Sequence, residues 1–288
     1  MSDLASMPSA PRLGLLAGWG RFPVAVAEAA QRRGFEVFCL GIRDHADSEA
    51  LRPICRDYRE IGLARLGATI RYFRGRGITQ ATMAGKIHKV RLFQRFAWLK
   101  HIPDWKCLKT FYPHFIRGTR DRRDDTLLTA IVEAYAADGI TLSPATDFAP
   151  ELLVKLGHLA GPDLSESQQA DIQFGWRIAK DLGRLDIGQT VAVKGQTVLA
   201  VEAIEGTDAC IRRAGELCTS GGFTVVKVSK PQQDMRFDVP TVGMHTLDSL
   251  AAAGAKVLAI EAGKTILVDQ QECLRRANDL RLTIVALD

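Results

Sequence analysis

Acidic side chains gather in two short segments in the second half of the sequence, and the second segment also contains a basic side chain. The first segment holds Glu202, Glu205 and Asp208, and the second holds Asp234, Arg236 and Asp238. Carboxylates and water hold Mg²⁺ in proteins, while nearby basic groups bind phosphoryl oxygens. Each segment alone is also compatible with solvated loop charges, but two such segments in one small domain favour a magnesium–phosphate site.

The histidines and cysteines show no spacing that suits a metal site built on nitrogen or sulfur. The six histidines include no H-x-H or H-E-x-x-H pair, which argues against zinc held by histidine. The six cysteines include no C-x-x-C pair, as expected for reduced thiols in a cytosol. A net charge of +5 indicates anionic partners without choosing among phosphate, membrane and nucleic acid.

A glycine-rich turn follows the first apolar run, residues 13–17. Gly18 and Gly20 allow a tight turn, and the N-terminus of the following helix offers N–H groups to an anion. The third glycine of a dinucleotide fingerprint is replaced by Pro23, and no acidic residue is well placed about 20 positions further on. The turn therefore supports a nicotinamide cofactor only weakly, and a tight turn without a ligand explains it as well.

A second glycine-containing segment, Gly263-Lys264-Thr265, resembles the end of a P-loop. A P-loop needs a glycine five residues before its Gly-Lys pair, where this chain has Leu258, and it must begin a helix. The residues that follow are apolar and favour a strand. We therefore predict a hairpin turn here and no ATP site.

Residues 86–123 interleave basic side chains with aromatic ones. Leu92, Phe93, Phe96 and Leu99 fall at helical spacing, which predicts an amphipathic basic helix. Three interpretations stay open. The helix has a solvated basic face, or it contacts an anionic membrane surface or a lipid's acyl chains. Nucleic-acid binding is the least favoured, because no recognition motif accompanies the segment.

Apolar runs alternate with helical patterns through the first half of the chain. We expect strands at 13–17, 35–40 and 81–84, and helices at 24–33, 65–74 and 124–137. This alternation predicts an α/β domain with a Rossmann-like parallel sheet. No apolar run approaches the roughly 18–20 residues of a membrane span, and residues 1–11 lack the pattern of a secretory signal, so we expect a short disordered leader there.

Prolines and glycines interrupt the pattern between residues 141 and 165. We therefore expect an N-terminal domain at 1–150, a linker at 151–164 and a C-terminal α/β domain at 165–288 that carries most of the catalytic site. Ser165 resembles a helix cap. Strands near 190–193 and 198–203 predict a hairpin around Gly195, and the later strands and helices predict a mixed sheet.

Three longer segments carry a resemblance to a known family. They are residues 183–189, 199–208 and 230–243, and the similarity extends from Leu13 to the C-terminus. The chain resembles the LpxI-type UDP-2,3-diacylglucosamine pyrophosphatases. The resemblance implies a Rossmann-like N-terminal domain and a C-terminal α/β domain, with the glycolipid between them. It also implies Mg²⁺-dependent (or Mn²⁺-dependent) hydrolysis to UMP and 2,3-diacylglucosamine 1-phosphate in lipid A biosynthesis.

The resemblance assigns roles to individual residues. Asp238 matches the essential aspartate, as a base or a metal ligand, and Lys230 and Arg236 would stabilise charge on the phosphates. The substrate-binding candidates are Gly18, Gly20, Gly85, Thr207, Gln233, Asp124 and Asp125, and the metal-ligand candidates are Asp238, Asp208, Glu202 and Glu205.

The resemblance implies a cytoplasmic protein whose partner is UDP-2,3-diacylglucosamine. Peripheral contact with the inner membrane and a homodimer are both compatible with it. The segment after Gly85 and the long aromatic insert between His88 and Arg117 depart from the family pattern, so acyl-chain preference is not implied. A non-catalytic nucleotide-sugar or lipid-binding protein on the same scaffold is the alternative, because a fold does not determine a function.

Overall fold

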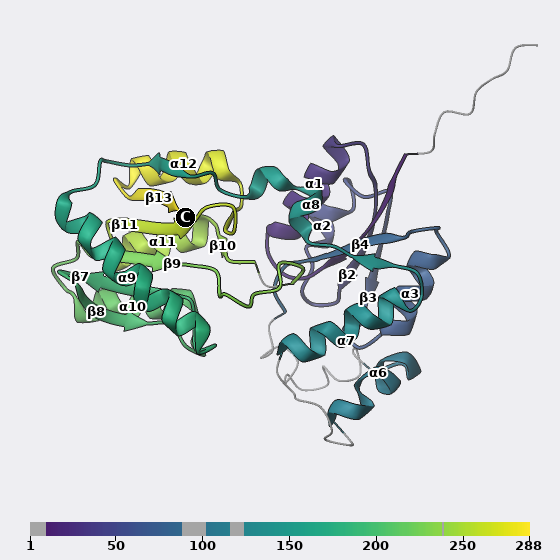
Figure 1. Ribbon diagram of the computed structural model, residues 1–288. Helices are drawn as coiled ribbons and strands as arrows, with labels where there is room; N and C mark the ends of the chain where they lie inside the picture. The colour runs from purple at the N-terminus through teal and green to yellow at the C-terminus, as the bar shows by residue number, and fades with distance from the viewer. Residues whose placement is uncertain (1–9, 88–101, 116–123, 238) are drawn as a thin grey trace, which may run out of the picture. The chain divides into compact units, whose positions relative to one another are not determined.

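The chain folds into two compact units in a computed structural model that describes residues 10–87, 102–115, 124–237 and 239–288 (Figure 1). The N-terminal unit runs to Ala149 and takes in Met235–Phe237. The C-terminal unit is the rest of the described chain from Pro150 onward. Among the described residues, no helix has the length and apolar character needed to cross a membrane.

The N-terminal unit is built on a five-stranded parallel sheet. Its strands are β1 (Arg12–Ala17), β2 (Glu36–Ile42), β3 (Asp57–Ile61), β4 (Gln80–Ala84) and β5 (Thr141–Leu142), in the order β3-β2-β1-β4-β5. This arrangement confirms the predicted Rossmann-like parallel sheet. The strand order reverses between β1 and β4, which makes the carboxyl ends of these two strands the topological switch point.

Helices cover this sheet because its central strands, such as β1 and β2, are apolar and buried on both sides. Helix α1 (Phe22–Arg32) contacts β1, β2 and β4, and it also contacts the short helix α8 (Ala145–Phe148). A separate apolar cluster joins residues of β2 and β4 to α3 (Leu66–Arg74), α6 (Trp105–Phe115) and α7 (Asp124–Ala136). The short helix α2 (Ser48–Leu51) precedes β3.

The ends of β1 and β4 are fastened to each other at the switch point. The backbone N–H of Gly18 donates to the carbonyl of Ala84 over 2.8 Å, and the N–H of Trp19 donates to the carbonyl of Lys86 over 2.8 Å. A Cβ on Gly85 would lie 2.7 Å from Cγ of Pro23 and 2.8 Å from the carbonyl carbon of Gly18. Two glycines are therefore needed for the strands to end this close together.

The C-terminal unit has a six-stranded mixed sheet in the order β6-β13-β11-β9-β7-β8. The strands are β6 (Gly157–Ala160), β7 (Thr190–Lys194), β8 (Thr197–Val201), β9 (Thr224–Lys227), β11 (Val257–Glu261) and β13 (Thr283–Leu287). The three central strands β9, β11 and β13 are parallel, and the outer strands pair antiparallel. This confirms the predicted mixed sheet.

Successive residues of the central strands face two different layers, as the period of a strand requires. One cluster holds Val226 and Ala259 with the long helix α9 (Glu166–Arg184). The other holds Val225 and Leu258 with α10 (Thr207–Leu217), α11 (Met244–Ala253) and α12 (Gln270–Asp279). The unit is thus a sheet with α9 on one face and three helices on the other (Figure 1).

Local sequence signals explain two boundaries of this unit. Ser165 accepts a hydrogen bond from the backbone N–H of Gln168, whose side chain accepts from the N–H of Ser165, so the predicted cap forms a capping box. Gly195 and Gln196 both have positive φ, +56° and +55°, between the antiparallel strands β7 and β8. This two-residue turn confirms the predicted hairpin.

Two segments differ from the expected pattern. Residues 151–164, expected as a linker, contain the 3₁₀ turn Pro150–Leu152 in part and the edge strand β6 in full. The segment after Glu261 is a turn, but it does not form the predicted hairpin. The strand that follows, β12 (Ile266–Leu267), pairs in parallel with β10 (Thr241–Val242) instead of with β11.

Gly85→Ala is expected to destabilise the protein more than Gly34→Ala. Both glycines have positive φ, +94° and +85°, so alanine carries a similar backbone strain of about 1–2 kcal/mol at each. Only at Gly85 does the added Cβ meet close neighbours, which should cost about 1–3 kcal/mol more. Urea unfolding of both variants measures the difference, and equal losses would contradict the crowding at the switch point.

Candidate functional site

Three segments singled out in the sequence meet at one edge of the six-stranded sheet. The backbone N–H of Glu202, after β8, donates to the carbonyl of Thr190 at the start of β7 over 2.8 Å. The N–H of Val228, after β9, donates to the carbonyl of Gln189 over 3.0 Å. Because β7 runs antiparallel to β8 and β9, residues 183–189 lie beside both of the other segments.

Two glycines allow residues 183–189 to approach these segments closely. A Cβ on Gly188 would overlap the carbonyl oxygen of Glu202, and a Cβ on Gly183 would lie 3.2 Å from Cδ of Pro231. In the same segment, Asp186 accepts a 2.7 Å hydrogen bond from Nζ of Lys230. Residues 183–189 therefore support the two polar segments.

A buried chain of hydrogen bonds runs through this edge. Nζ of Lys227 donates to the hydroxyl of Thr207 over 2.7 Å, and that hydroxyl donates to Oε1 of Glu202 over 2.8 Å. Lys227 is 5% exposed and Glu202 is 8% exposed. The Thr207 hydroxyl thus connects a buried cation to a buried anion, which lowers the cost of keeping both charges out of water.

The three elements that carry this chain determine its geometry. Lys227 is the last residue of β9, Glu202 follows β8, and Thr207 is the first residue of α10. Gly206, the residue before α10, has a φ of +83°, a backbone conformation that glycine adopts readily. Sequence reasoning missed Lys227. The available signal was a lysine directly after the apolar residues of a strand that is buried on both faces.

The four predicted metal ligands differ in what their oxygens already bind. Glu205 accepts from the N–H of Ala203 over 3.2 Å and from Arg213 over 2.8 Å. Within the described parts of the chain, one buried oxygen of Glu202 and one of Asp208 have no hydrogen-bond partner. Asp238 lies outside the described residues.

The described residues contain no group of three or more His, Cys, Asp or Glu side chains that could hold a metal ion. Glu202 and Asp208 each keep a buried oxygen without a hydrogen-bond partner among the described residues, whereas the two oxygens of Glu205 accept from Arg213 and from the backbone of Ala203. The role of these carboxylates as metal ligands stays a prediction.

Gln233 lies in the third segment and organises its beginning. Its Oε1 accepts from the hydroxyl of Ser229 and from the backbone N–H of Lys230, both over 2.9 Å. Its Nε2 is buried and has no hydrogen-bond partner among the residues that the structure describes. The side chain is therefore held by one end, with its amide donor directed away from these two partners.

Glu261, at the end of β11, supports the same segment. Oε2 of Glu261 accepts from the backbone N–H of Ser229 over 2.8 Å and from Lys180 over 2.6 Å, and Oε1 accepts from Lys264 over 2.8 Å. Burial by itself raises the pKa of this carboxyl group, but the hydrogen bonds from Lys180, Lys264 and Ser229 outweigh burial and lower the pKa. Neither Glu261 nor Lys180 was predicted as part of a site.

Of the substrate-binding residues predicted in the N-terminal unit, Gly18 and Gly85 lie next to each other. Gly18 and Gly85 meet at the switch point, where the N–H groups of Gly18 and Trp19 donate to carbonyl oxygens of the chain. Gly20 has a φ of +102° and open space at its Cβ position. Asp124 and Asp125 begin α7, and their side chains lie outside what the structure describes.

Arg236 belongs to Met235–Phe237, which is part of the N-terminal unit although the preceding residues belong to the C-terminal unit. Its guanidinium group lies over the ring of Phe237 at 5.2 Å from the centroid. Such a contact orients a cation on an aromatic face. The prediction that Arg236 binds phosphate stays a prediction.

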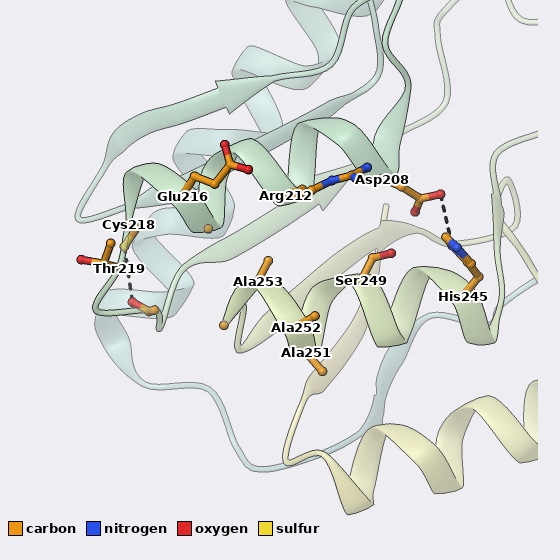
Figure 2. Close-up of a pocket in the computed structure, with 13 residues that line it drawn as sticks. Asp208, Arg212, Glu216, Cys218, Thr219, His245, Ser249, Ala251, Ala252 and Ala253 are labelled. Carbon is orange, nitrogen blue, oxygen red and sulfur yellow. Dashed lines mark hydrogen bonds and ion pairs between the residues drawn. The ribbon is translucent and has the colours of Figure 1, made fainter.

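A cavity of about 660 Å³ lies along α10 and α11 in the C-terminal unit (Figure 2). At one end, Oδ2 of Asp208 lies 3.3 Å from Nδ1 of His245, and small residues such as Gly215 and Ala253 line the space between the helices. Of its lining residues, only Asp208 belongs to the three segments. We therefore take the sheet edge, and not this cavity, as the candidate site.

The fold and the site define a two-domain α/β protein with a Rossmann-like N-terminal unit and a charged sheet edge in a mixed C-terminal unit. Two protein-family models match this chain, one over each half. The model for the LpxI N-terminal domain matches residues 12–152, and the model for the LpxI C-terminal domain matches residues 155–285. The chain belongs to the LpxI family, as its sequence resemblance predicted.

One relative has a described activity. UDP-2,3-diacylglucosamine pyrophosphatase LpxI of Caulobacter vibrioides is 31% identical over 284 residues. The match covers 96% of this chain and 98% of that protein, so both units are included.

Thr207→Val should destabilise the C-terminal unit by about 1–3 kcal/mol, because Lys227 and Glu202 lose the hydroxyl that they share. Thr224→Val is the matched control in β9. The Thr224 side chain is fully buried, and its hydroxyl has no partner within the described residues, so valine should be neutral or stabilising. Urea unfolding compares the two, and equal effects would show that the Lys227–Thr207–Glu202 chain contributes no stability.

Proposed function

We propose that this protein hydrolyses the pyrophosphate bond of UDP-2,3-diacylglucosamine, giving UMP and 2,3-diacylglucosamine 1-phosphate. The observation that carries the proposal is the meeting of residues 183–189, 199–208 and 230–234 at one sheet edge, where cations and carboxylates are bound to one another. The activity of the Caulobacter vibrioides relative, which matches over both units, supports the same substrate.

The residues at this edge suit the charge changes of such a reaction. Water attacks one phosphorus atom, the bridging P–O bond breaks, and the leaving phosphate takes the bond's electron pair. Negative charge grows on the phosphate oxygens, and Lys230, with Arg236, would stabilise it. The buried Lys227 adds a cation that the sequence did not predict. Asp238 is proposed to accept the proton of the attacking water or to bind a metal ion.

Mg²⁺ or Mn²⁺ is the proposed cofactor, and carboxylates at this edge could supply some of the oxygen ligands that such an ion needs. Magnesium in phosphate-processing sites is held by one or two carboxylates together with waters and substrate oxygens. Glu202 and Asp208 each have an oxygen without a partner among the described residues, so they are the proposed ligands beside Asp238. The ion would neutralise negative charge on the pyrophosphate.

We further propose that the protein works in the cytoplasm, within lipid A biosynthesis, and touches the inner membrane peripherally. Trp105, Leu108 and Tyr112 lie at helical spacing on α6 and are exposed, with Trp105 79% exposed. Exposed aromatic and apolar side chains on a basic amphipathic segment suit a membrane interface. The Phe93 and Phe96 region that prompted this prediction lies outside the described residues. A homodimer also stays a prediction.

The purified protein should release UMP from UDP-2,3-diacylglucosamine in the presence of Mg²⁺. EDTA should abolish release, and added Mg²⁺ or Mn²⁺ should restore it, because the pyrophosphate charge must be neutralised. Chromatography of UMP measures turnover. Binding of the substrate without UMP release would favour the alternative, a non-catalytic nucleotide-sugar or lipid-binding protein. Full activity after exhaustive chelation would contradict the proposed metal requirement alone.

Asp238→Ala should lower kcat by about 10²–10⁴-fold, the usual cost of losing a general base. Substrate binding should be retained, because Lys230 and the other cations remain. Asp248→Ala is the control, since Asp248 is an exposed carboxylate of the C-terminal unit that pairs with Arg276. An Asp238→Ala enzyme that keeps more than about a tenth of the wild-type rate would exclude the proposed role, and Asp208 would be tested next.

A further inference from the structure

Glu261 is a buried carboxylate whose partners come from three separate parts of the C-terminal unit. The residue is 4% exposed at the end of β11. Lys180 reaches it from α9, Lys264 from the turn after β11, and the backbone N–H of Ser229 from the segment after β9. Two lysines are sufficient to offset the charge of one carboxylate. The hydrogen bond from the N–H of Ser229 therefore attaches the backbone of that segment to Glu261 and is not needed to neutralise it.

Ser229 begins the segment that holds Lys230 and Gln233. The hydroxyl of Ser229 and the N–H of Lys230 both donate to Oε1 of Gln233 over 2.9 Å. Lys180 also lies 3.5 Å from the carbonyl oxygen of Ser229. The backbone of residue 229 is thus bound on both its N–H and its carbonyl side, and the Gln233 side chain is fixed relative to that residue.

We propose that Glu261 is a positioning residue for residues 229–234, and that it places Lys230 and Gln233 for the substrate's phosphates. The inference rests on the proposed function for its catalytic consequence, but not for its structural one. A charge-assisted hydrogen bond from a backbone N–H to a buried carboxylate holds the backbone more firmly than a bond to a neutral acceptor. A carboxylate on a rigid central strand therefore restricts where the following segment can go.

The chain offers a matched carboxylate that holds a different segment. Asp171 on α9 is 5% exposed, and it accepts from the backbone N–H of Gly195 over 3.1 Å and from that of Gln196 over 2.6 Å. Those two residues form the turn between β7 and β8. Asp171 and Glu261 thus share burial and a backbone hydrogen-bonding role, but only Glu261 contacts the segment that carries Lys230.

The test compares full-length wild type with Glu261→Gln, Glu261→Asp and Asp171→Asn by amide hydrogen exchange and steady-state kinetics. Glu261→Asp keeps the charge for both lysines but draws the carboxylate back by about 1.5 Å, the length of one C–C bond. Glu261→Gln and Asp171→Asn each replace one acceptor oxygen with an NH₂ group. Exchange is followed in peptides that cover residues 229–234 and 195–197.

In both Glu261 variants, the backbone amides of residues 229–234 should exchange at least about tenfold faster than in the wild type, because the hydrogen bond from the N–H of Ser229 is weakened or lost. Exchange at residues 195–197 should stay unchanged. Asp171→Asn should show the reverse. With UDP-2,3-diacylglucosamine, kcat should fall about 10²-fold in Glu261→Asp while KM changes little, as misplacement of a catalytic group by about 1 Å can cause. Asp171→Asn should keep the wild-type kcat.

Wild-type exchange at 229–234 in folded Glu261→Asp would overturn the proposal, and so would faster exchange with an unchanged kcat. If Glu261→Gln fails to fold, Glu261→Asp decides the question, since it keeps a negative charge opposite Lys180 and Lys264. If the wild type releases no UMP, the proposed function fails, and the exchange experiment still tests whether Glu261 holds residues 229–234.

Discussion

The hydrogen bond from the Thr207 hydroxyl to Glu202 holds together three segments at one edge of the C-terminal sheet. Lys227 occupies the end of a strand that is covered on both faces, so its ammonium group must find a partner inside the protein. Thr207 is one such partner, and its hydroxyl is available there because α10 begins at that residue. One hydroxyl group therefore connects the end of β9, the exit from β8 and the start of a helix.

Two glycines, which have no side chain, allow the chain segments at this edge to approach each other closely. Gly188 lies against the carbonyl of Glu202, and Gly183 lies against Lys230 and Pro231. At Gly188 the nearest atoms belong to the backbone of Glu202, which cannot move aside as a flexible side chain can. At Gly183 the atoms nearest to an added Cβ are Cδ of Pro231 and Cα of Lys230, at 3.2 and 3.3 Å. A side chain at residue 188 would push this segment away from Glu202, whose side chain accepts the hydrogen bond from Thr207. Close backbone approach and charge pairing thus depend on each other.

Most of the fold was predictable because its signals are local in the sequence. Apolar runs with helices between them indicated the parallel sheet, Ser165 indicated a helix start and Gly195 a turn. The site was less predictable. Lys227 and Glu261 gain their roles through the strand order β11-β9-β7, which brings together residues far apart in the chain. The pairing of β12 with β10 was missed for the same reason, because an isolated turn does not reveal which strand its next residues will join.

Both ends of the segment between Ser229 and Pro240 are attached to one short stretch of chain. Its beginning is bound by Glu261, and its end is bound by Ile266, whose N–H donates to the carbonyl of Pro240 over 2.8 Å. A loop closed on fixed ends loses little additional entropy when it grows, about 0.6 kcal/mol for each doubling of its length. The entropy cost of closing this segment therefore depends little on its length. The two attachments instead determine where the chain leaves the C-terminal unit, before Met235–Phe237 join the N-terminal unit, and where it returns.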